Sequence, residues 1–113
     1  MKAEAQSAVQ FPVRTYDFGT ITEDTDSVTC KIDVVNSGNK PLIIEGVHVN
    51  CGCVSATNST RPIAPGGKGY ITATLYPKGK EGTTLKSIYV YTNTIPRKNV
   101  VRVKAFVVPA KNE

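Results

Sequence analysis

The chain has 113 residues, which fits one folded domain because an independent hydrophobic core usually needs on the order of 100 residues. Hydrophobic residues make up 40% of the sequence and charged residues 20%. These proportions exclude bulk disorder, a collagen-like repeat and an isolated coiled coil. No apolar run approaches the ~18 residues that a membrane-spanning helix requires.

The formal net charge of +5 is unevenly distributed along the chain. Residues 1–50 carry four basic and seven acidic side chains, whereas residues 51–113 carry ten basic and two acidic ones. The basic residues of the second half are scattered rather than clustered in a run, so nucleic acid is not expected as a partner. They fit solvated strand faces and loops, or a surface that attracts an anionic partner.

Alternation of apolar and polar residues predicts a series of short β-strands from residue 11 onward. A first strand is expected around residues 16–18. In residues 28–34 every second side chain is apolar, including Cys30, which predicts a strand with one buried face. The Asn, Gly and Pro residues of 36–41 predict a turn that leads into a strand at 42–44.

The remaining strands are separated by clusters of Gly, Pro and Asn. They are expected at residues 70–76, 88–92 and 101–105, with one more short strand at 47–49 or 54–56. About seven short strands without a helical segment predict an all-β fold, an immunoglobulin-like antiparallel β-sandwich. We expect the sandwich to span residues 13–109, with a flexible N-terminal leader at 1–12 and a C-terminal tail at 110–113.

Several motifs occur in a characteristic order. They are Tyr-Asp-Phe-Gly-Thr-Ile at 16–21, the strand–turn–strand segment 32–44 with Asn-Ser-Gly-Asn-Lys-Pro, Asn-Cys-Gly-Cys at 50–53, Ile-Ala-Pro-Gly-Gly at 63–67 and Ile-Tyr-Val-Tyr-Thr-Asn at 88–93. Together they resemble a family of bacterial domains of unknown function, found in exported or lipid-anchored envelope proteins. That family is similar in fold to immunoglobulin-like domains of the major-sperm-protein and cilia-associated type.

This resemblance covers roughly residues 14–108. It implies the immunoglobulin-like fold and a periplasmic, outer-membrane-associated or extracellular location in a bacterium. It carries over no activity and no catalytic residue.

The densest group of reactive side chains is His48, Cys51 and Cys53. A Cys51–Cys53 disulfide would close a very small ring and suit thiol exchange. Alternatively, the three side chains could bind copper or zinc, which prefer thiolate and imidazole ligands. A third interpretation is structural, with both cysteines packed at a strand end and Gly52 providing a tight bend through positive φ. Cys30 is expected to be a core thiol.

Tyrosines on two predicted strands form a candidate binding surface. Tyr70 and Tyr76 share one face of the strand at 70–76, and Tyr89 and Tyr91 share one face of the strand at 88–92. If these strands are neighbours, the tyrosines would form one surface for a protein or a glycan. Cross-strand stabilisation of a sheet suffices to explain the same residues and is the favoured explanation.

The sequence favours a non-enzymatic binding or assembly module of a bacterial cell-envelope or secreted protein. The expected partner is a protein or glycan of the envelope, and no cofactor is expected. The alternative is a thiol-redox or soft-metal-handling protein that uses the Cys51-Gly52-Cys53 motif.

Overall fold

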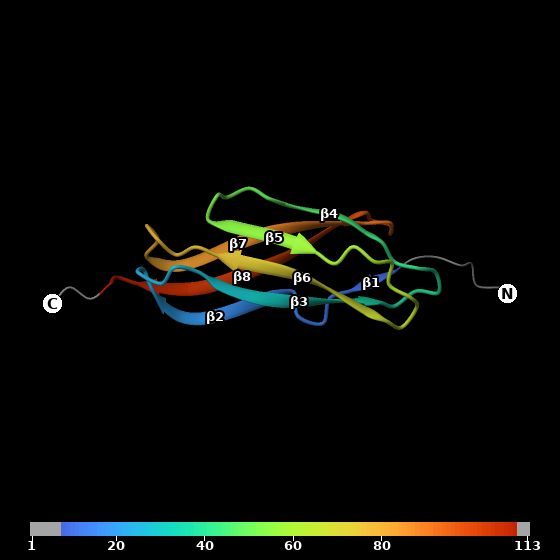
Figure 1. The fold of residues 1–113 in the computed structure, drawn as a ribbon, viewed down its shortest axis with the longest axis horizontal. Helices are drawn as coiled ribbons and strands as arrows, with labels where there is room; N and C mark the ends of the chain where they lie inside the picture. Colours follow the sequence, from blue (N-terminus) through green and yellow to red (C-terminus); the bar gives the residue numbers. More distant parts are fainter. Residues whose placement is uncertain (1–7, 111–113) are drawn as a thin grey trace.

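A computed structural model describes residues 8–110 of the chain. It contains eight strands in two four-stranded sheets that pack face to face, so the predicted β-sandwich is confirmed (Figure 1). The strands are β1 (Val9–Gln10), β2 (Thr15–Thr22), β3 (Val28–Asn36), β4 (Ile44–Val49), β5 (Val54–Asn58), β6 (Lys68–Leu75), β7 (Gly82–Thr92) and β8 (Lys98–Val108). No helix among the described residues is long and apolar enough to cross a membrane.

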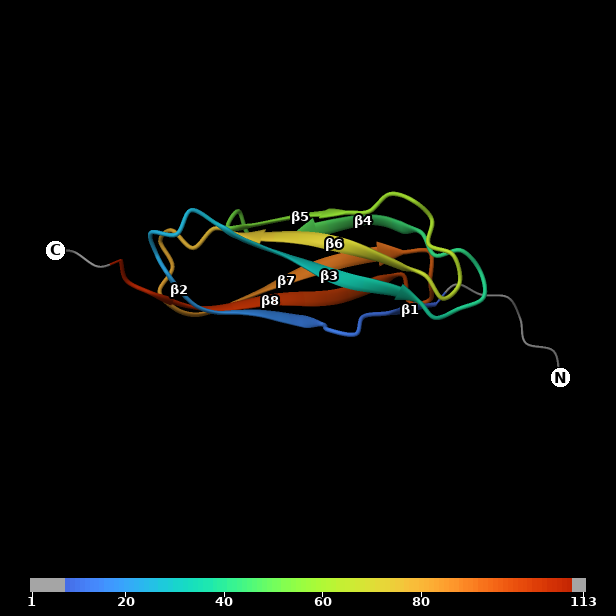
Figure 2. The same ribbon diagram turned by 60° about the horizontal axis from the view of Figure 1, so that its bottom comes forward.

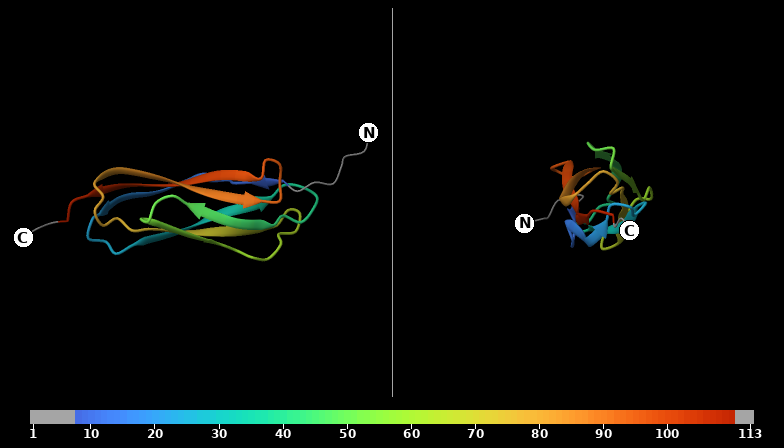
Figure 3. Two further views of the ribbon diagram at one scale, coloured as in Figure 1. Left: turned by 90° about the horizontal axis from the view of Figure 1, so that it is seen from above. Right: turned by 90° about the vertical axis from the view of Figure 1, so that its left-hand side faces the viewer.

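One sheet has the order β1-β3-β6-β5 and the other has the order β2-β8-β7-β4. The ribbons of β3 and β6 lie over those of β7 and β8 (Figure 2). The view along the sandwich shows the two layers end-on (Figure 3, right). β5 is an edge strand of the first sheet and β4 is an edge strand of the second, and these two strands lie next to each other.

The predicted alternation of apolar and polar residues determines which side chains form the core. Cys30, Ile32 and Val34 of β3 are buried, whereas Thr29 and Lys31 between them are exposed. The same pattern buries every second residue of the central strands of both sheets: Ile71, Ala73 and Leu75 on β6, Ile88 and Val90 on β7, and Val101, Val103, Ala105 and Val107 on β8. The core therefore closes with aliphatic side chains and without tryptophan.

The sandwich is not wholly antiparallel, because β2 pairs with β8 in parallel. Strand β1 pairs with β3 in one sheet, and the chain then crosses to β2 in the other sheet. Phe11 is buried at this crossing, and the amide of Arg102 donates to the carbonyl of Arg14 (2.7 Å). Gly19, with φ of +77°, lies where the register of β2 shifts, and its amide donates to the Asp17 carboxylate.

β1 lies within the segment that the sequence assigned to a flexible leader, so residues 9–11 belong to the fold and the boundary at residue 13 is too late. A two-residue strand offers no periodicity from which it could be predicted. Residues 1–7 of the predicted leader and residues 111–113 of the predicted tail lie outside the described residues.

Two further strand predictions change. β4 contains Ile44 of the segment predicted at 42–44 and all of the segment predicted at 47–49, while Leu42 makes an isolated bridge to Ile63. β5 occupies the site predicted at 54–56. β7 begins six residues before the predicted strand at 88–92, because pairing with β8 extends through the Gly-containing segment.

Asn36 organises the turns at one end of the sandwich. Its side chain is 1% exposed and donates to the carbonyls of Lys40 (2.7 Å) and Ile63 (2.8 Å). Its Oδ1 accepts from the amide of Gly38 (2.9 Å). Every buried side-chain nitrogen or oxygen within residues 8–110 has a hydrogen-bond partner.

We expect Asn36→Leu to lower the free energy of unfolding by roughly 2–4 kcal/mol, because it removes the hydrogen bonds that the buried side chain donates to the carbonyls of Lys40 and Ile63 and accepts from the amide of Gly38. Urea denaturation followed by circular dichroism measures this change. Ser37→Ala, at the adjacent exposed position, is the control and should change the value by less than about 0.5 kcal/mol. Equal stability of the two variants would contradict the role assigned to Asn36.

Candidate functional site

The Cys51-Gly52-Cys53 turn connects the edge strands β4 and β5. The two cysteine sulfurs are joined in a disulfide, with Cα atoms 5.2 Å apart. The turn is also fixed by its backbone, since the amide of Val54 donates to the carbonyl of Cys51 and the amide of Tyr76 donates to the carbonyl of Cys53. The disulfide is therefore held at a defined place at the end of the sandwich.

Gly52 does not have the role that the sequence suggested. Its φ is not positive, and a Cβ at this position would meet no heavy atom within 4 Å. The turn therefore does not need glycine for its backbone conformation or for space.

The two sulfur-bearing residues have different surroundings. Cys53 packs against the hydrophobic core. Cys51 lines an open pocket of about 240 Å³ with Lys86 and Tyr89, and the backbone amide of Cys53 donates to its Sγ (3.3 Å). Cys51 therefore lies at an open pocket that a lysine also lines.

The predicted His48, Cys51 and Cys53 metal site is not assembled. The cysteines are bonded to each other, and the Nε2 of His48 shares a hydrogen bond with the Asn50 side chain (2.9 Å). The His48 ring lies beside Tyr89 on the outer face of β4 and β7, with ring centroids 6.4 Å apart. No group of three His, Cys, Asp or Glu side chains in residues 8–110 is placed to hold a metal ion.

Cys30 is a buried free thiol in the core, as predicted. Burial raises the pKa of this thiol to about 11, and a backbone hydrogen bond involving Ala73 opposes the increase in part. Cys30 thus stays protonated and unreactive at neutral pH.

The four candidate tyrosines do not form one surface. Tyr70 and Tyr76 lie on or next to β6, whereas Tyr89 and Tyr91 belong to β7, and these strands are in opposite sheets. Their outward side chains therefore face opposite sides of the molecule. Each side pairs one tyrosine with a lysine: Lys31 Nζ lies 4.5 Å from the Tyr70 ring centre, and Lys98 Nζ lies 4.5 Å from that of Tyr89.

The basic residues of the second half gather in part on β8. Lys98, Arg102 and Lys104 are exposed at alternating outward positions, and the sheet register places Asp17 opposite Lys104. Leu85 and Phe106, both about half exposed, lie on the same outer face.

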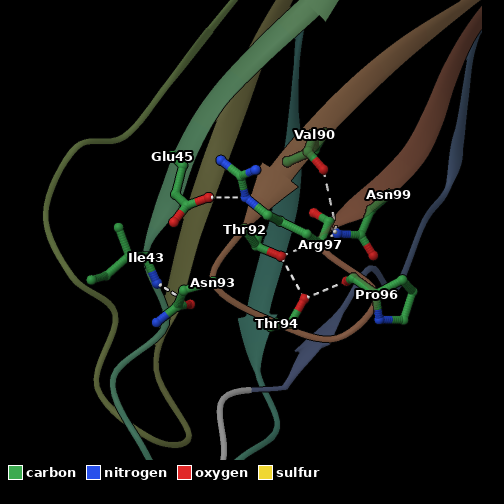
Figure 4. Close-up of polar contacts among 9 residues, drawn as sticks. All are labelled: Ile43, Glu45, Val90, Thr92, Asn93, Thr94, Pro96, Arg97 and Asn99. Carbon is green, nitrogen blue, oxygen red and sulfur yellow. Dashed lines mark hydrogen bonds and ion pairs between the residues drawn. The ribbon is translucent and has the colours of Figure 1, made fainter.

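Hydrogen bonds and an ion pair of polar side chains hold the turn between β7 and β8 (Figure 4). Thr92 and Thr94 share a buried hydroxyl–hydroxyl hydrogen bond (2.6 Å), and Thr94 donates to the carbonyl of Pro96 (2.8 Å). Asn93 accepts from the amide of Ile43 and donates to the carbonyl of Pro41. Arg97 forms an ion pair with Glu45 (2.6 Å).

This turn presents Ile95, which is 100% exposed, at its tip. A neighbouring cleft of about 310 Å³ is lined by Val9, Arg14, Ile95 and Pro96 among others. Sequence reasoning treated residues 93–98 only as a separator between strands. The sequence feature that could have indicated a binding site here is Ile95, a large aliphatic residue within an otherwise polar turn.

The hairpin tip and the disulfide turn lie at opposite ends of the sandwich (Figure 3, left). β4 and β7 run antiparallel. The C-terminal end of β4, which leads to Cys51, therefore lies beside the N-terminal part of β7, whereas the hairpin follows the C-terminal end of β7. The two features are therefore separate sites.

A family model described as a protein of unknown function (DUF1573) matches residues 9–107. The resemblance drawn from the sequence motifs is thereby confirmed. No curated protein matches the chain.

Solved structures confirm the fold type. A protein of unknown function from Porphyromonas gingivalis W83 has a TM-score of 0.78 and 20% identity, with 94% of this chain and 49% of that chain covered. The ASH/PapD-like domain 7 of human CEP192 has a TM-score of 0.66 and 12% identity, covering 98% and 92%. WR4, a C. elegans MSP family member, has a TM-score of 0.54 and 9% identity, covering 93% and 100%. The chain spans about half the length of the Porphyromonas protein.

We expect protein purified without reductant to have, after denaturation, a mass two hydrogens below that of the fully reduced chain, because Cys51 and Cys53 are bonded. Iodoacetamide should then modify one residue, Cys30. Mass spectrometry before and after reduction measures both. Modification of all three cysteines without reduction would contradict the disulfide.

We also expect stability to fall as the pH rises from 9 to 11, because the Cys30 thiol ionises in the unfolded chain at a lower pH than in the folded one. The contribution of this thiol is fully present below pH 9, and its loss by pH 11 is on the order of 2 kcal/mol. Cys30→Val removes the titrating group and keeps an apolar core residue. The difference between the two unfolding free energies should grow across this range, whereas parallel curves would contradict the assignment.

Proposed function

The chain belongs to the DUF1573 family of proteins of unknown function, and we propose from its own geometry that it is a binding and assembly module. It binds another protein through the tip of the β7–β8 hairpin. The observation that carries this proposal is Ile95, a large aliphatic side chain fully exposed on a turn whose polar side chains are held by hydrogen bonds.

Burial of Ile95 in an apolar pocket of a partner supplies a favourable contribution of about 1.5–3 kcal/mol. The polar contacts of Thr94, Asn93 and Arg97 hold the turn before binding, so less conformational entropy is lost on association. Anchors of this kind, large and set on a rigid support, contribute much of the binding energy at protein interfaces.

The chemistry of the tip favours a protein over a glycan. The neighbouring cleft is lined by Ile95, Pro96 and Val9. Ile43 is also exposed, and its backbone amide donates a hydrogen bond to Asn93 at the base of the turn. Glycan sites are better served by exposed aromatic rings, and the candidate tyrosines of this molecule lie on the two outer sheet faces rather than at the tip.

We place this module in the bacterial cell envelope or outside the cell. The Cys51–Cys53 disulfide supports that location, because disulfides persist in oxidising compartments and are rare in a reducing cytoplasm. The scattered positive charge of β8 would add long-range attraction to an acidic partner without determining the binding site.

The test is site-specific photo-crosslinking in the cells that produce the protein. A photoreactive amino acid at position 95 should give a discrete adduct with one partner protein, whereas the same group at Lys31, exposed on the opposite sheet, should not. Ile95→Asp should abolish capture by a second photoreactive group at position 43 and leave thermal stability unchanged. Identical adducts from positions 95 and 31, or no adduct from position 95, would contradict the proposal.

A further inference from the structure

The disulfide end of the sandwich carries a second feature, an unpaired length of strand. β4 pairs with β7 only as far as Val49 opposite Ile88, so residues 82–87 of β7 have β8 as their one strand partner within the described chain. The opening left beyond β4 is the pocket lined by Cys51, Leu85, Lys86 and Ser87. A strand edge and a disulfide therefore meet at one place.

The register shows which backbone groups face this opening. Thr92 donates to the carbonyl of Arg97 across the β7–β8 pair, so the even-numbered residues of β7 are hydrogen-bonded to β8. The amides and carbonyls of the odd-numbered residues Thr83, Leu85 and Ser87 consequently point away from β8. They form a template for one more antiparallel or parallel strand.

The surroundings of Cys51 favour its thiolate. The backbone amide of Cys53 donates to Cys51 Sγ (3.3 Å), and Lys86 lines the same pocket of about 240 Å³. The pocket-lining residues include no acidic side chain. A hydrogen-bond donor and a lysine in the same pocket both favour a thiolate, which makes Cys51 a good leaving group when it is released from a mixed disulfide. The substrate first attacks Cys51 because Cys51 lines the pocket, whereas Cys53 packs against the core.

We propose that Cys51 and Cys53 form a thiol–disulfide exchange site whose substrate is an extended, cysteine-bearing polypeptide docked along the free edge of β7. This activity goes beyond the binding role assigned to the hairpin and is located at the other end of the molecule. An acidic residue in the docked strand would be favoured beside Lys86.

The exchange proceeds in two balanced steps. A thiolate of the substrate attacks Cys51 Sγ, the Cys51–Cys53 bond breaks, and Cys53 leaves as a thiolate that takes a proton from water. A second substrate thiolate then attacks the substrate sulfur of the mixed disulfide and releases Cys51 as a thiolate, stabilised by the Cys53 amide and Lys86. The substrate dithiol loses two electrons and becomes a disulfide, and the protein gains them as a dithiol.

The test uses the oxidised full chain and a short capped peptide of alternating Val and Thr with one central Cys and one Glu. Mass spectrometry under non-reducing conditions follows the mixed disulfide. We expect the peptide to react roughly tenfold faster than N-acetylcysteine amide at equal thiolate concentration and to be attached to Cys51. A peptide with prolines at the amide-donating positions should lose this advantage.

Variants separate the contributions of the site. Lys86→Gln should slow the reaction by roughly two- to fivefold, as expected for a partly exposed charge. Lys31→Gln, at an exposed position on the other sheet, should leave the rate unchanged. The assay contains no partner protein, so failure of this proposal is distinguishable from failure of the hairpin proposal. Lack of alkylation at Cys30 in the same samples verifies that each variant remains folded. Equal rates for the peptide, its proline control and the small thiol, or attachment at Cys53, would overturn the proposal.

Discussion

The structure depends on one constraint, the burial of alternating aliphatic side chains between two sheets. The inner positions of β3, β6, β7 and β8 are all but inaccessible to solvent, and neither a tryptophan nor a disulfide joins the two layers. Because alternation commits every second residue to the core, the remaining side chains face solvent or occupy the strand ends. Side chains that could bind a partner or react are consequently confined to the outer faces, the sheet edges and the turns.

The two ends of the sandwich are built from different interactions. At the hairpin end, Asn36 and the Thr92–Thr94 pair hold the turns through buried hydrogen bonds, and the side chain of Ile95 is fully exposed. At the other end, β4 stops before β7 does, so an edge of the sheet and a disulfide are left adjacent. A rigid core holds both ends apart and allows each to act independently.

The three cysteines illustrate how position decides chemistry. Cys30 alternates with core residues, and burial raises its pKa to about 11, so it acts as a small hydrophobic side chain. Cys53 packs against the core but is bonded to Cys51, which lines a pocket with a lysine. The same residue type thus packs in the core on β3 and forms a disulfide in the turn between β4 and β5.

The sequence by itself determined the fold class, because period-two alternation is local and needs no knowledge of partners. It also determined that Cys30 is buried and that Cys51 and Cys53 are the reactive candidates. Only the tertiary structure decided that β2 runs parallel to β8, that Tyr70 and Tyr89 face opposite sides, and that Lys86 shares a pocket with Cys51. These facts depend on which strands are neighbours, a property set by contacts between residues far apart in the chain. The exposure of Ile95 belongs to the same class, since a turn residue is exposed or covered according to what the rest of the chain places around it.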